Sequence, residues 1–260
     1  RGSKEMTIKR AVIDADILLF QSAASVEHAA EWPDGMWTWH AFENEGEAAL
    51  DDMVKGLYAA VVAEYPECTE VIMALSGDRS KNFRKQLLPT YKSNRKGSRK
   101  PLLYKHLEER LLKEYNCVIE ETLEGDDLLG LMADDETVLV TIDKDLQTVP
   151  GHHYNFNKKE FFTVDEDSAD YFNMYQALTG DTTDGYAGIP GIGPVAATKI
   201  LDDEPKCRWF TVAYEKAAKK GLSEDYVDRQ YATAHILRPG EYDYTTKEVK
   251  GPAGPFLKPV

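Results

Sequence analysis

Several apolar runs in this chain end at or near an aspartate, and this recurrence constrains the fold more than any other feature. The clearest runs are residues 8–13 before Asp14, 70–75 before Asp78 and 137–142 before Asp143. Helix-like patterns separate them, and strands that alternate with helices predict an α/β fold with a central, mostly parallel sheet wrapped by helices. Parallel strands end at one edge of the sheet, where such folds bind their ligands. We therefore expect these aspartates to meet at that edge.

Shorter patterns complete the expected order of elements. Strands are predicted at 117–120 and 153–156, and helices at 47–64, 102–115, 124–132, 168–178 and 194–201. Residues 31–42 hold three tryptophans around a Pro-Asp-Gly turn, which predicts strands joined by a turn. Those aromatics are expected to pack within the fold, with stacking on a substrate as the alternative. The tail, residues 239–260, is rich in proline and glycine and is expected to be irregular.

Acidic residues gather in five short clusters. They are Asp14 with Asp16, Asp78, Glu124 with Asp126 and Asp127, Asp143 with Asp145, and Asp181 with Asp184. Carboxylates brought so close would repel one another unless cations joined them, so we predict a divalent metal site. Two Mg²⁺ ions would explain the number of ligands and would activate water for phosphodiester hydrolysis. For the cluster at Glu124, capping of a helix is the alternative interpretation.

A glycine-rich loop follows the last acidic cluster. Residues 188–194 read Gly-Ile-Pro-Gly-Ile-Gly-Pro, with a helical pattern on either side. Two helices joined by such a turn can aim backbone N–H groups and a helix N-terminus at an anion. The loop is therefore a candidate site for a phosphate of a nucleic-acid backbone, and a tight turn without a ligand is the alternative.

The distribution of charge favours a nucleic-acid partner, although the net charge of −14 alone would argue against one. Residues 79–106, which we call the basic segment, contain ten lysines and arginines and no aspartate or glutamate. Tyr91 lies among these cations, and the mixture suits backbone contacts together with a stacking platform for a base. A solvated basic surface is the alternative.

The remaining composition narrows the class of protein. The three cysteines are scattered and form no CxxC pair, so neither a disulfide framework nor a zinc site is expected. This use of cysteine suits a protein of the reducing cytoplasm. Neither a membrane span nor a secretory signal is predicted from the hydropathy pattern. No Ser-His-Asp set is evident either, which leaves metal-activated water as the expected nucleophile.

In this order, the motifs resemble the metal-dependent 5′-nuclease superfamily, which includes flap endonucleases and the 5′-nuclease domain of bacterial DNA polymerase I. The likeness spans residues 8–201 and is closest to the 5′→3′ exonucleases of short-tailed bacteriophages. The matching strings are Val-Ile-Asp14-Ala-Asp16, Gly77-Asp78 with Phe83-Arg84, Leu88-Pro-Thr-Tyr91-Lys92-Ser-Asn-Arg95, Glu124-Gly-Asp126-Asp127, Thr141-Ile-Asp143-Lys-Asp145, and Gly180-Asp181-Thr-Thr-Asp184 before Gly191-Ile192-Gly193.

The resemblance implies a role for each matching position. Lys92 and Arg95 would hold and polarise the scissile phosphate, and Tyr91 would stack on an end base. One metal ion would be served by Asp14, Asp78, Glu124 and Asp126, and the other, or its waters, by Asp127, Asp143, Asp145, Asp181 and Asp184. Contacts to DNA would come from Arg84, Tyr91, Lys92, Arg95, Lys96, Gly191, Ile192, Gly193 and Lys199. The loop would be a helix–three-turn–helix element, which in relatives also binds K⁺.

The implied organisation is a nuclease core over residues 6–166, a helical subdomain over 167–238 and an irregular tail over 239–260. The basic segment occupies the place of the arch or gateway that covers the site in relatives. The implied protein is a 5′→3′ exonuclease with flap-like cleavage, using Mg²⁺ or Mn²⁺. It would be a monomer acting on duplex DNA with a 5′ end or flap, and on RNA in RNA–DNA hybrids. If encoded by a phage, it would act in the host cytoplasm.

One feature departs from the family pattern, and two other functions remain open. Many relatives carry basic residues just after the glycine loop, where this chain has Val195 and Ala196, so Lys199 is the only nearby cation in sequence. The alternatives are a single-strand ribonuclease of the PIN type and a non-catalytic DNA-binding module with structural metal. The ribonucleases usually lack the glycine loop. Because this chain has the loop, the 5′-nuclease interpretation is favoured.

Overall fold

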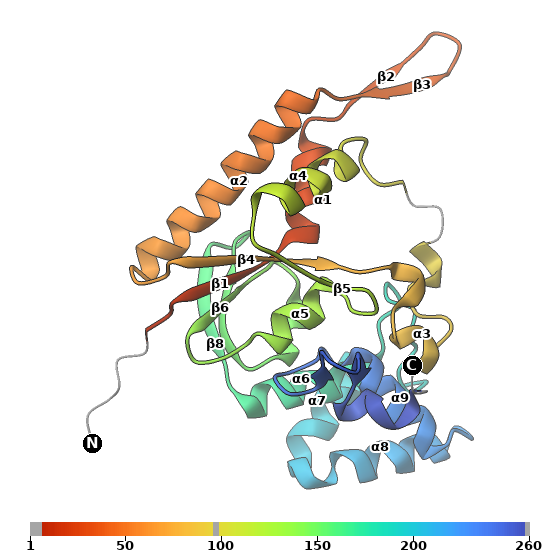
Figure 1. The fold of residues 1–260 in the computed structure, drawn as a ribbon. Coiled ribbons are helices and arrows are strands. Elements are labelled where there is room, and N and C mark those ends of the chain that lie inside the picture. Colours follow the sequence, from red (N-terminus) through yellow and green to blue (C-terminus); the bar gives the residue numbers. More distant parts are fainter. Residues whose placement is uncertain (1–6, 96–98, 258–260) are drawn as a thin grey trace.

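The computed structural model describes residues 7–95 and 99–257, which form a six-stranded sheet with helices on both faces (Figure 1). The strand order is β5-β4-β1-β6-β7-β8, with every neighbouring pair parallel except β7 and β8. The strand bounds are β1 Arg10–Asp14, β4 Glu70–Ser76, β5 Cys117–Glu120, β6 Thr137–Val140, β7 Gly151–Asn155 and β8 Glu160–Val164. The predicted α/β fold with a mostly parallel central sheet is confirmed.

Alternate residues of the central strands enter two separate cores. Ala11 and Ile13 of β1 face a core shared with three helices, and Val12 between them faces the opposite core. The first core includes α1 (Ala15–Ser25), α2 (Glu43–Glu64) and α4 (Tyr104–Glu114), and the second includes α5 (Gly125–Leu131) and α9 (Glu224–Ala234). Burial on both faces explains why the central strands are continuous apolar runs, without the alternation of a half-exposed strand.

A helical region follows the sheet and packs below it in Figure 1. It contains α6 (Glu166–Thr179), α7 (Pro194–Asp203), α8 (Trp209–Ala218) and α9, which share a third apolar core. Helix α6 also packs on the 3₁₀ turn that follows β6, and α9 packs on α6. These contacts hold the helical region against the carboxyl edge of the sheet, where the acidic clusters lie.

The basic segment begins along that same edge with three short helical pieces, and its described part ends in the first turn of α4. The three pieces are η1 (Arg79–Lys81), α3 (Arg84–Leu87) and η2 (Ser93–Arg95). Within the described part of the segment, α3 lies against α9 and against η5 (Gly251–Phe256) of the tail. The elements of the segment are therefore anchored to the helical region as well as to the sheet.

Three details differ from the sequence prediction or extend it. Strand β8 was not predicted, because Glu160–Val164 is a short, partly exposed edge strand without clear alternation. The tail was predicted to be irregular, but its described part contains the small hairpin of β9 (Tyr242–Asp243) and β10 (Glu248–Val249) as well as η5. The predicted strands within 31–42 are found as a hairpin of β2 (His28–Glu31) and β3 (Trp37–His40), displaced slightly toward the N-terminus. None of the helices in the described residues is long and apolar enough to cross a membrane.

Candidate active site

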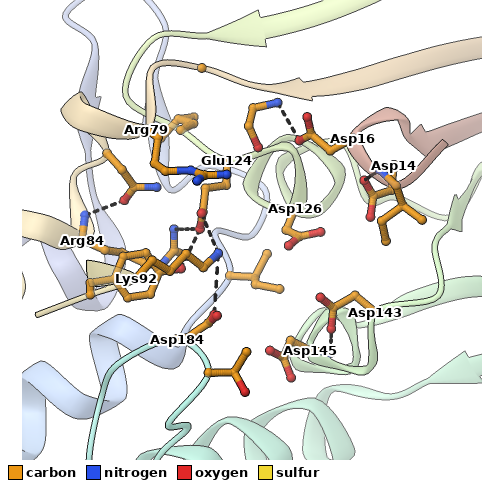
Figure 2. A pocket seen from close by; sticks show the side chains of 18 of the residues that line it. Asp14, Asp16, Arg79, Arg84, Lys92, Glu124, Asp126, Asp143, Asp145 and Asp184 are labelled. Atoms are coloured by element: carbon orange, nitrogen blue, oxygen red, sulfur yellow. Dashed lines mark hydrogen bonds and ion pairs between the residues drawn. The ribbon is translucent and has the colours of Figure 1, made fainter. Parts of the chain in front are cut away.

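A cleft of about 970 Å³ opens at the carboxyl edge of the sheet, and acidic side chains dominate its lining (Figure 2). The predicted metal-site residues that line it are Asp14, Asp78, Glu124, Asp126, Asp143, Asp145, Asp181 and Asp184, and they are joined there by Asp16 and Glu108. The eight predicted residues come from the ends of β1, β4 and β6, from the start of α5 and from the loop after α6, whereas Asp16 lies in α1 and Glu108 in α4. The structure thus brings together eight of the nine predicted metal ligands, from five separate places in the sequence.

Hydrogen bonds at the strand ends fix the aspartates locally. Asp14 caps α1, because Oδ1 accepts from the Ile17 N–H at 3.3 Å, and its Oδ2 accepts from the Thr141 hydroxyl at 2.9 Å. Asp143 caps the turn after β6 by accepting from the N–H of Asp145 at 2.9 Å. Each aspartate therefore stabilises the first turn that follows its strand, and this local role keeps one carboxylate near the cleft.

The electrostatics of the cleft show that its negative charge is poorly compensated. Burial and the neighbouring Asp16 raise the pKa of Asp14 to about 7. Burial and Asp143 raise the pKa of Asp145 to about 7, and burial together with Asp14 and Asp143 raises the pKa of Asp126. Oxygen-rich, mutually repelling carboxylates of this kind suit hard divalent cations such as Mg²⁺.

The carboxylates are not yet arranged as a closed coordination sphere. In residues 7–95 and 99–257, no group of three or more acidic, histidine or cysteine side chains is placed to hold a metal ion as it stands. Figure 2 shows Asp14, Asp126 and Asp143 around one open space, with Asp145 and Asp184 beyond it. The donor set therefore fits divalent metal by chemistry and position, and its side chains would have to turn inward to share an ion.

Glu124 has a different environment, in which cations outweigh burial. Its Oε1 accepts from the Lys92 ammonium at 2.6 Å and its Oε2 from the Tyr91 hydroxyl at 2.7 Å. Burial would raise the pKa of Glu124, but Lys92 and the guanidinium of Arg84 together lower it to about 2. Lys92 also lies 3.6 Å from Asp184. In this state the predicted phosphate-binding lysine is paired with two of the predicted metal ligands.

The backbone around Lys92 is held against the acidic loop after α6. Lys92 has a φ of 49°, and its N–H donates to the carbonyl of Asp184 at 2.7 Å. Gly185 lies so close that an added Cβ would come within 2.5 Å of the Thr90 carbonyl oxygen, so only glycine fits there. The Asn94 amide donates to the carbonyls of Thr182 and Thr183. The basic segment and the loop after α6 are therefore fastened together beside the cleft.

Asp127 and Arg84 differ from their predicted roles. Asp127 is fully buried and faces Arg84 and not the cleft, with both carboxylate oxygens accepting from the guanidinium at 2.7 Å. Asp127 also accepts from the backbone N–H of Glu124, which completes a capping box on α5. Arg84, 2% exposed, further donates to the carbonyls of Thr233 and His235. The pair holds α3, α5 and the end of α9 together, and the guanidinium of Arg84, although it lines the cleft, is engaged with groups of the protein itself.

The other residues predicted to contact nucleic acid differ in how accessible they are. Tyr91 is buried, with its hydroxyl on Glu124, so its ring is not open to an end base in this state. The side chain of Arg95 and the whole of Lys96 lie outside the described residues. Lys199 is exposed on α7, as a contact to DNA requires.

The glycine loop presents its backbone at the surface. Gly191 has a φ of 89° and is exposed, Ile192 is partly buried, and Gly193 is the exposed N-cap of α7. Val195, 86% exposed, leaves the first turn of α7 uncharged. A cation missed by sequence reasoning lies here: a Cβ added to Gly191 would be 3.5 Å from Nζ of Lys220, which follows α8. No sequence signal identified Lys220, because α8 brings it to the loop from 29 positions away along the chain.

A mostly parallel sheet with clustered carboxylates at its edge, beside a basic segment and a glycine loop, is an arrangement suited to a nuclease. No family model matches the chain. It is 30% identical to the exodeoxyribonuclease of Enterobacteria phage T3, over 92% of this chain and 90% of that protein. It is 29% identical to the exonuclease of Escherichia phage T7, over 92% and 91%. The chain belongs to this family of phage exonucleases.

Solved structures confirm the fold. The flap endonuclease of bacteriophage T5, in a pseudo-enzyme–product complex with DNA and metal ions, aligns with a TM-score of 0.59 and 16% identity. That alignment covers 88% of this chain and 89% of the phage T5 chain. A mutant of the T5 5′-exonuclease aligns with a TM-score of 0.56 and 15% identity, over 88% of each chain.

Proposed function

We propose that the protein is a 5′→3′ exodeoxyribonuclease that also cleaves flap structures and leaves 5′-phosphorylated products. The observation that carries this proposal is the convergence of eight predicted carboxylates on one cleft, in a chain of the phage exonuclease family. Its substrate is duplex DNA with a 5′ end or flap, and RNA in RNA–DNA hybrids is a further substrate. It acts as a monomer.

The proposed cofactors are two Mg²⁺ ions, which Mn²⁺ can replace. One would be held by Asp14, Asp78, Glu124 and Asp126, and the other, directly or through water, by Asp143, Asp145, Asp181 and Asp184. Bound metal would supply hydroxide and stabilise charge on the phosphate. Asp127 is now assigned to positioning, because it holds the N–H of Glu124. A K⁺ ion at the glycine loop is a further proposed ligand.

The decisive test follows end-labelled duplexes with recessed 5′ ends, with 5′ flaps and as closed circles, in Mg²⁺ and in EDTA. We expect mononucleotide or short products from the first two, no product from the circle and none in EDTA. Cleavage of single-stranded RNA with intact duplex DNA would instead establish a ribonuclease. Binding of DNA without cleavage in Mg²⁺ or Mn²⁺ would establish a non-catalytic module.

Replacing Lys92 with Ala is expected to slow cleavage by about 10²-fold or more, because a positioned cation beside the transferred phosphoryl group is lost. The same change frees Glu124 from its 2.6 Å ion pair. Single-turnover rates with saturating enzyme measure the effect, and DNA affinity should change much less. A rate within twofold of the wild type would show that Lys92 only pairs with Glu124.

Replacing Lys220 with Ala is expected to weaken duplex binding and to reduce the slope of log affinity against log salt by about 1, because one phosphate contact is lost. Lys220 lies beside Gly191 and has no ion-pair partner among the described residues. Binding isotherms in Ca²⁺ at several salt concentrations provide the measurement. Lys113, in the last turn of α4, is the matched control, since the neighbouring Leu111 packs in the core shared with α1 and α2, and an equal effect there would contradict the assignment.

The increase in Tm produced by Mg²⁺ should grow as the pH rises. Asp14 and Asp145, whose pKa values are raised to about 7, hold protons in the folded metal-free protein that the unfolded chain has released. Metal-free stability therefore falls as the pH rises from about 4 to about 7 and then levels off. Mg²⁺ binds the ionised carboxylates and offsets this loss.

Thermal unfolding with and without Mg²⁺ between about pH 5.5 and pH 8 measures the difference. His153, whose pKa is lowered to about 4 by burial, titrates in both samples and cancels in the comparison. A Tm increment that is the same at every pH would show that these carboxylates do not bind the ion.

A further inference from the structure

The β2–β3 hairpin projects away from the body of the protein (Figure 1), and its tryptophans do not pack as expected. Trp32 is 52% exposed, Trp37 49% and Trp39 44%. Large aromatic side chains usually bury most of their surface, so three half-exposed indoles on one hairpin indicate a binding surface. This surface lies outside the cleft described above and has no role yet in the proposed reaction.

Two of the tryptophans form a single platform on one face of the hairpin. Trp37 and Trp39 alternate with Thr38 along β3, so both indoles project from the same face. Their ring centroids are 6.5 Å apart and the ring planes are inclined to each other by 28°. Trp32 lies on the other face, where its indole N–H donates to the Thr38 hydroxyl at 3.0 Å. The platform is therefore defined by Trp37 and Trp39.

Cations connect the platform to the catalytic cleft. The guanidinium of Arg99 lies 5.0 Å from the ring centroid of Trp39, and both Arg99 and Lys100 line the cleft. The Lys100 ammonium lies 3.7 Å above the ring of Tyr104, whose hydroxyl donates to Asp16 at 2.9 Å. No acidic partner of Lys100 is present in the described part of the chain. Arg99 and Lys100 therefore link the lining of the cleft to the indole of Trp39.

The root of the hairpin is fixed in this position by one carboxylate. Glu27 accepts from both terminal nitrogens of Arg99 and from the backbone N–H of Leu102. At the tip, Glu31 and Asp34 are exposed and negative, so phosphates would be disfavoured there. The charge distribution therefore directs a phosphate backbone toward the root, beside Lys100, while bases reach the indole faces.

We propose that the platform of Trp37 and Trp39, together with Lys100 at the edge of the cleft, binds unpaired single-stranded DNA that extends from the catalytic cleft. The proposal rests on the proposed nuclease function and specifies which part of its substrate this surface takes. Indoles stack on unpaired bases, whereas the bases of a duplex are covered by their neighbours except at its ends. Figure 1 shows the hairpin and the helical region with the glycine loop at opposite ends of the protein, so duplex and single strand would be held on opposite sides of the cleft.

This surface would control the choice between flaps and plain 5′ ends. A 5′ flap supplies unpaired bases to the platform and a recessed 5′ end does not. Stacking would therefore favour flap substrates over recessed ends. Loss of the indoles should reduce this preference.

The test compares the double variant Trp37→Ala/Trp39→Ala with Trp32→Ala, a matched control on the opposite face of the same hairpin. Binding of a labelled twelve-nucleotide oligothymidylate is measured by fluorescence anisotropy in EDTA. Because EDTA removes divalent metal, the oligonucleotide is not cleaved during the measurement. The double variant should bind about 10-fold or more weakly, because stacking on each indole contributes to affinity, and the control should bind within about twofold of wild type. In Mg²⁺, the double variant should also show a lower ratio of flap to recessed-end kcat/KM.

Each outcome decides the matter. Unchanged oligothymidylate affinity in the double variant, or an equal loss in the Trp32→Ala control, overturns the proposal; unchanged affinity would point to a protein partner for the hairpin. If the double variant misfolds, Lys100→Glu provides a second test with the same expected loss of affinity. Absence of cleavage by the wild-type protein in Mg²⁺ would refute the nuclease function, yet the anisotropy measurement would still report on the platform.

Discussion

Replacing Asp143 with Asn is expected to reduce single-turnover cleavage by about 10³-fold or more while DNA binding is largely retained. Asn is isosteric with Asp, and its side-chain oxygen can still accept from the Asp145 N–H, which holds the turn after β6. The variant therefore keeps the local structure and loses only the charge that a metal ion requires. Rapid-quench measurements with saturating enzyme test the chemical step directly.

The Tm of the Asp143→Asn variant without metal provides an internal control for correct folding. The Asp143 carboxylate raises the pKa of both Asp126 and Asp145, so its neutralisation should relieve repulsion and raise the Tm of the metal-free protein. A stabilised but inactive protein is thus the expected phenotype. Turnover near the wild-type value would refute the assignment of Asp143 to the metal site, and a lowered Tm would show that misfolding caused the loss.

Replacing Arg84 with Ala is expected to destabilise the protein by about 3–5 kcal/mol, because the fully buried carboxylate of Asp127 loses its partner. This corresponds to a fall in Tm of roughly 6–20 °C for a chain of this size. Activity should fall as well, since Asp127 holds the N–H of Glu124 and Arg84 contacts the Glu124 carboxylate at 3.5 Å. Chemical denaturation and cleavage rates on the same preparation measure both effects.

The matched comparison is the double variant Arg84→Met/Asp127→Leu, which removes both charges and keeps the volume. Replacing a whole buried ion pair usually costs far less than breaking it, so this variant should be more stable than Arg84→Ala. Had Arg84 been a DNA contact, its replacement by Ala would weaken binding and leave the Tm unchanged. That result would refute the positioning role.

The position of the acidic cleft at the carboxyl edge of the sheet could be predicted from the sequence, because two independent patterns coincide there. Buried parallel strands are apolar throughout, and a polar cap must follow each one, so Asp14 and Asp143 mark both the end of a strand and the site. For the adjacent residues Asp126 and Asp127, the same patterns could not predict which side chain faces the cleft. One helical step of about 100° separates them, and only packing against Arg84 determines which one faces the cleft.

Surface features depended on tertiary placement that no local pattern encodes. The hairpin at residues 31–42 was predicted, but the exposure of its tryptophans follows from how far it projects beyond α1 and α2. Lys220 reaches the glycine loop only because α8 folds back along α7. Tyr91 carries an aromatic ring in a basic segment, which suggested a stacking platform, yet burial beside Glu124 removes it from the surface.

The contacts of Arg84 with the carbonyls of Thr233 and His235, and of Asp127 with the N–H of Leu237, tie α3 and the start of α5 to a segment more than a hundred positions further along the chain. Ribosomes extend a chain from its N-terminus, so every cleft carboxylate emerges before residues 233–237 do. Until those residues arrive, the Arg84–Asp127 pair lacks the backbone groups that complete its hydrogen bonds, so α5 is held by fewer contacts. We therefore expect the cleft to reach its final geometry only after residues 233–237 have folded against α3 and α5.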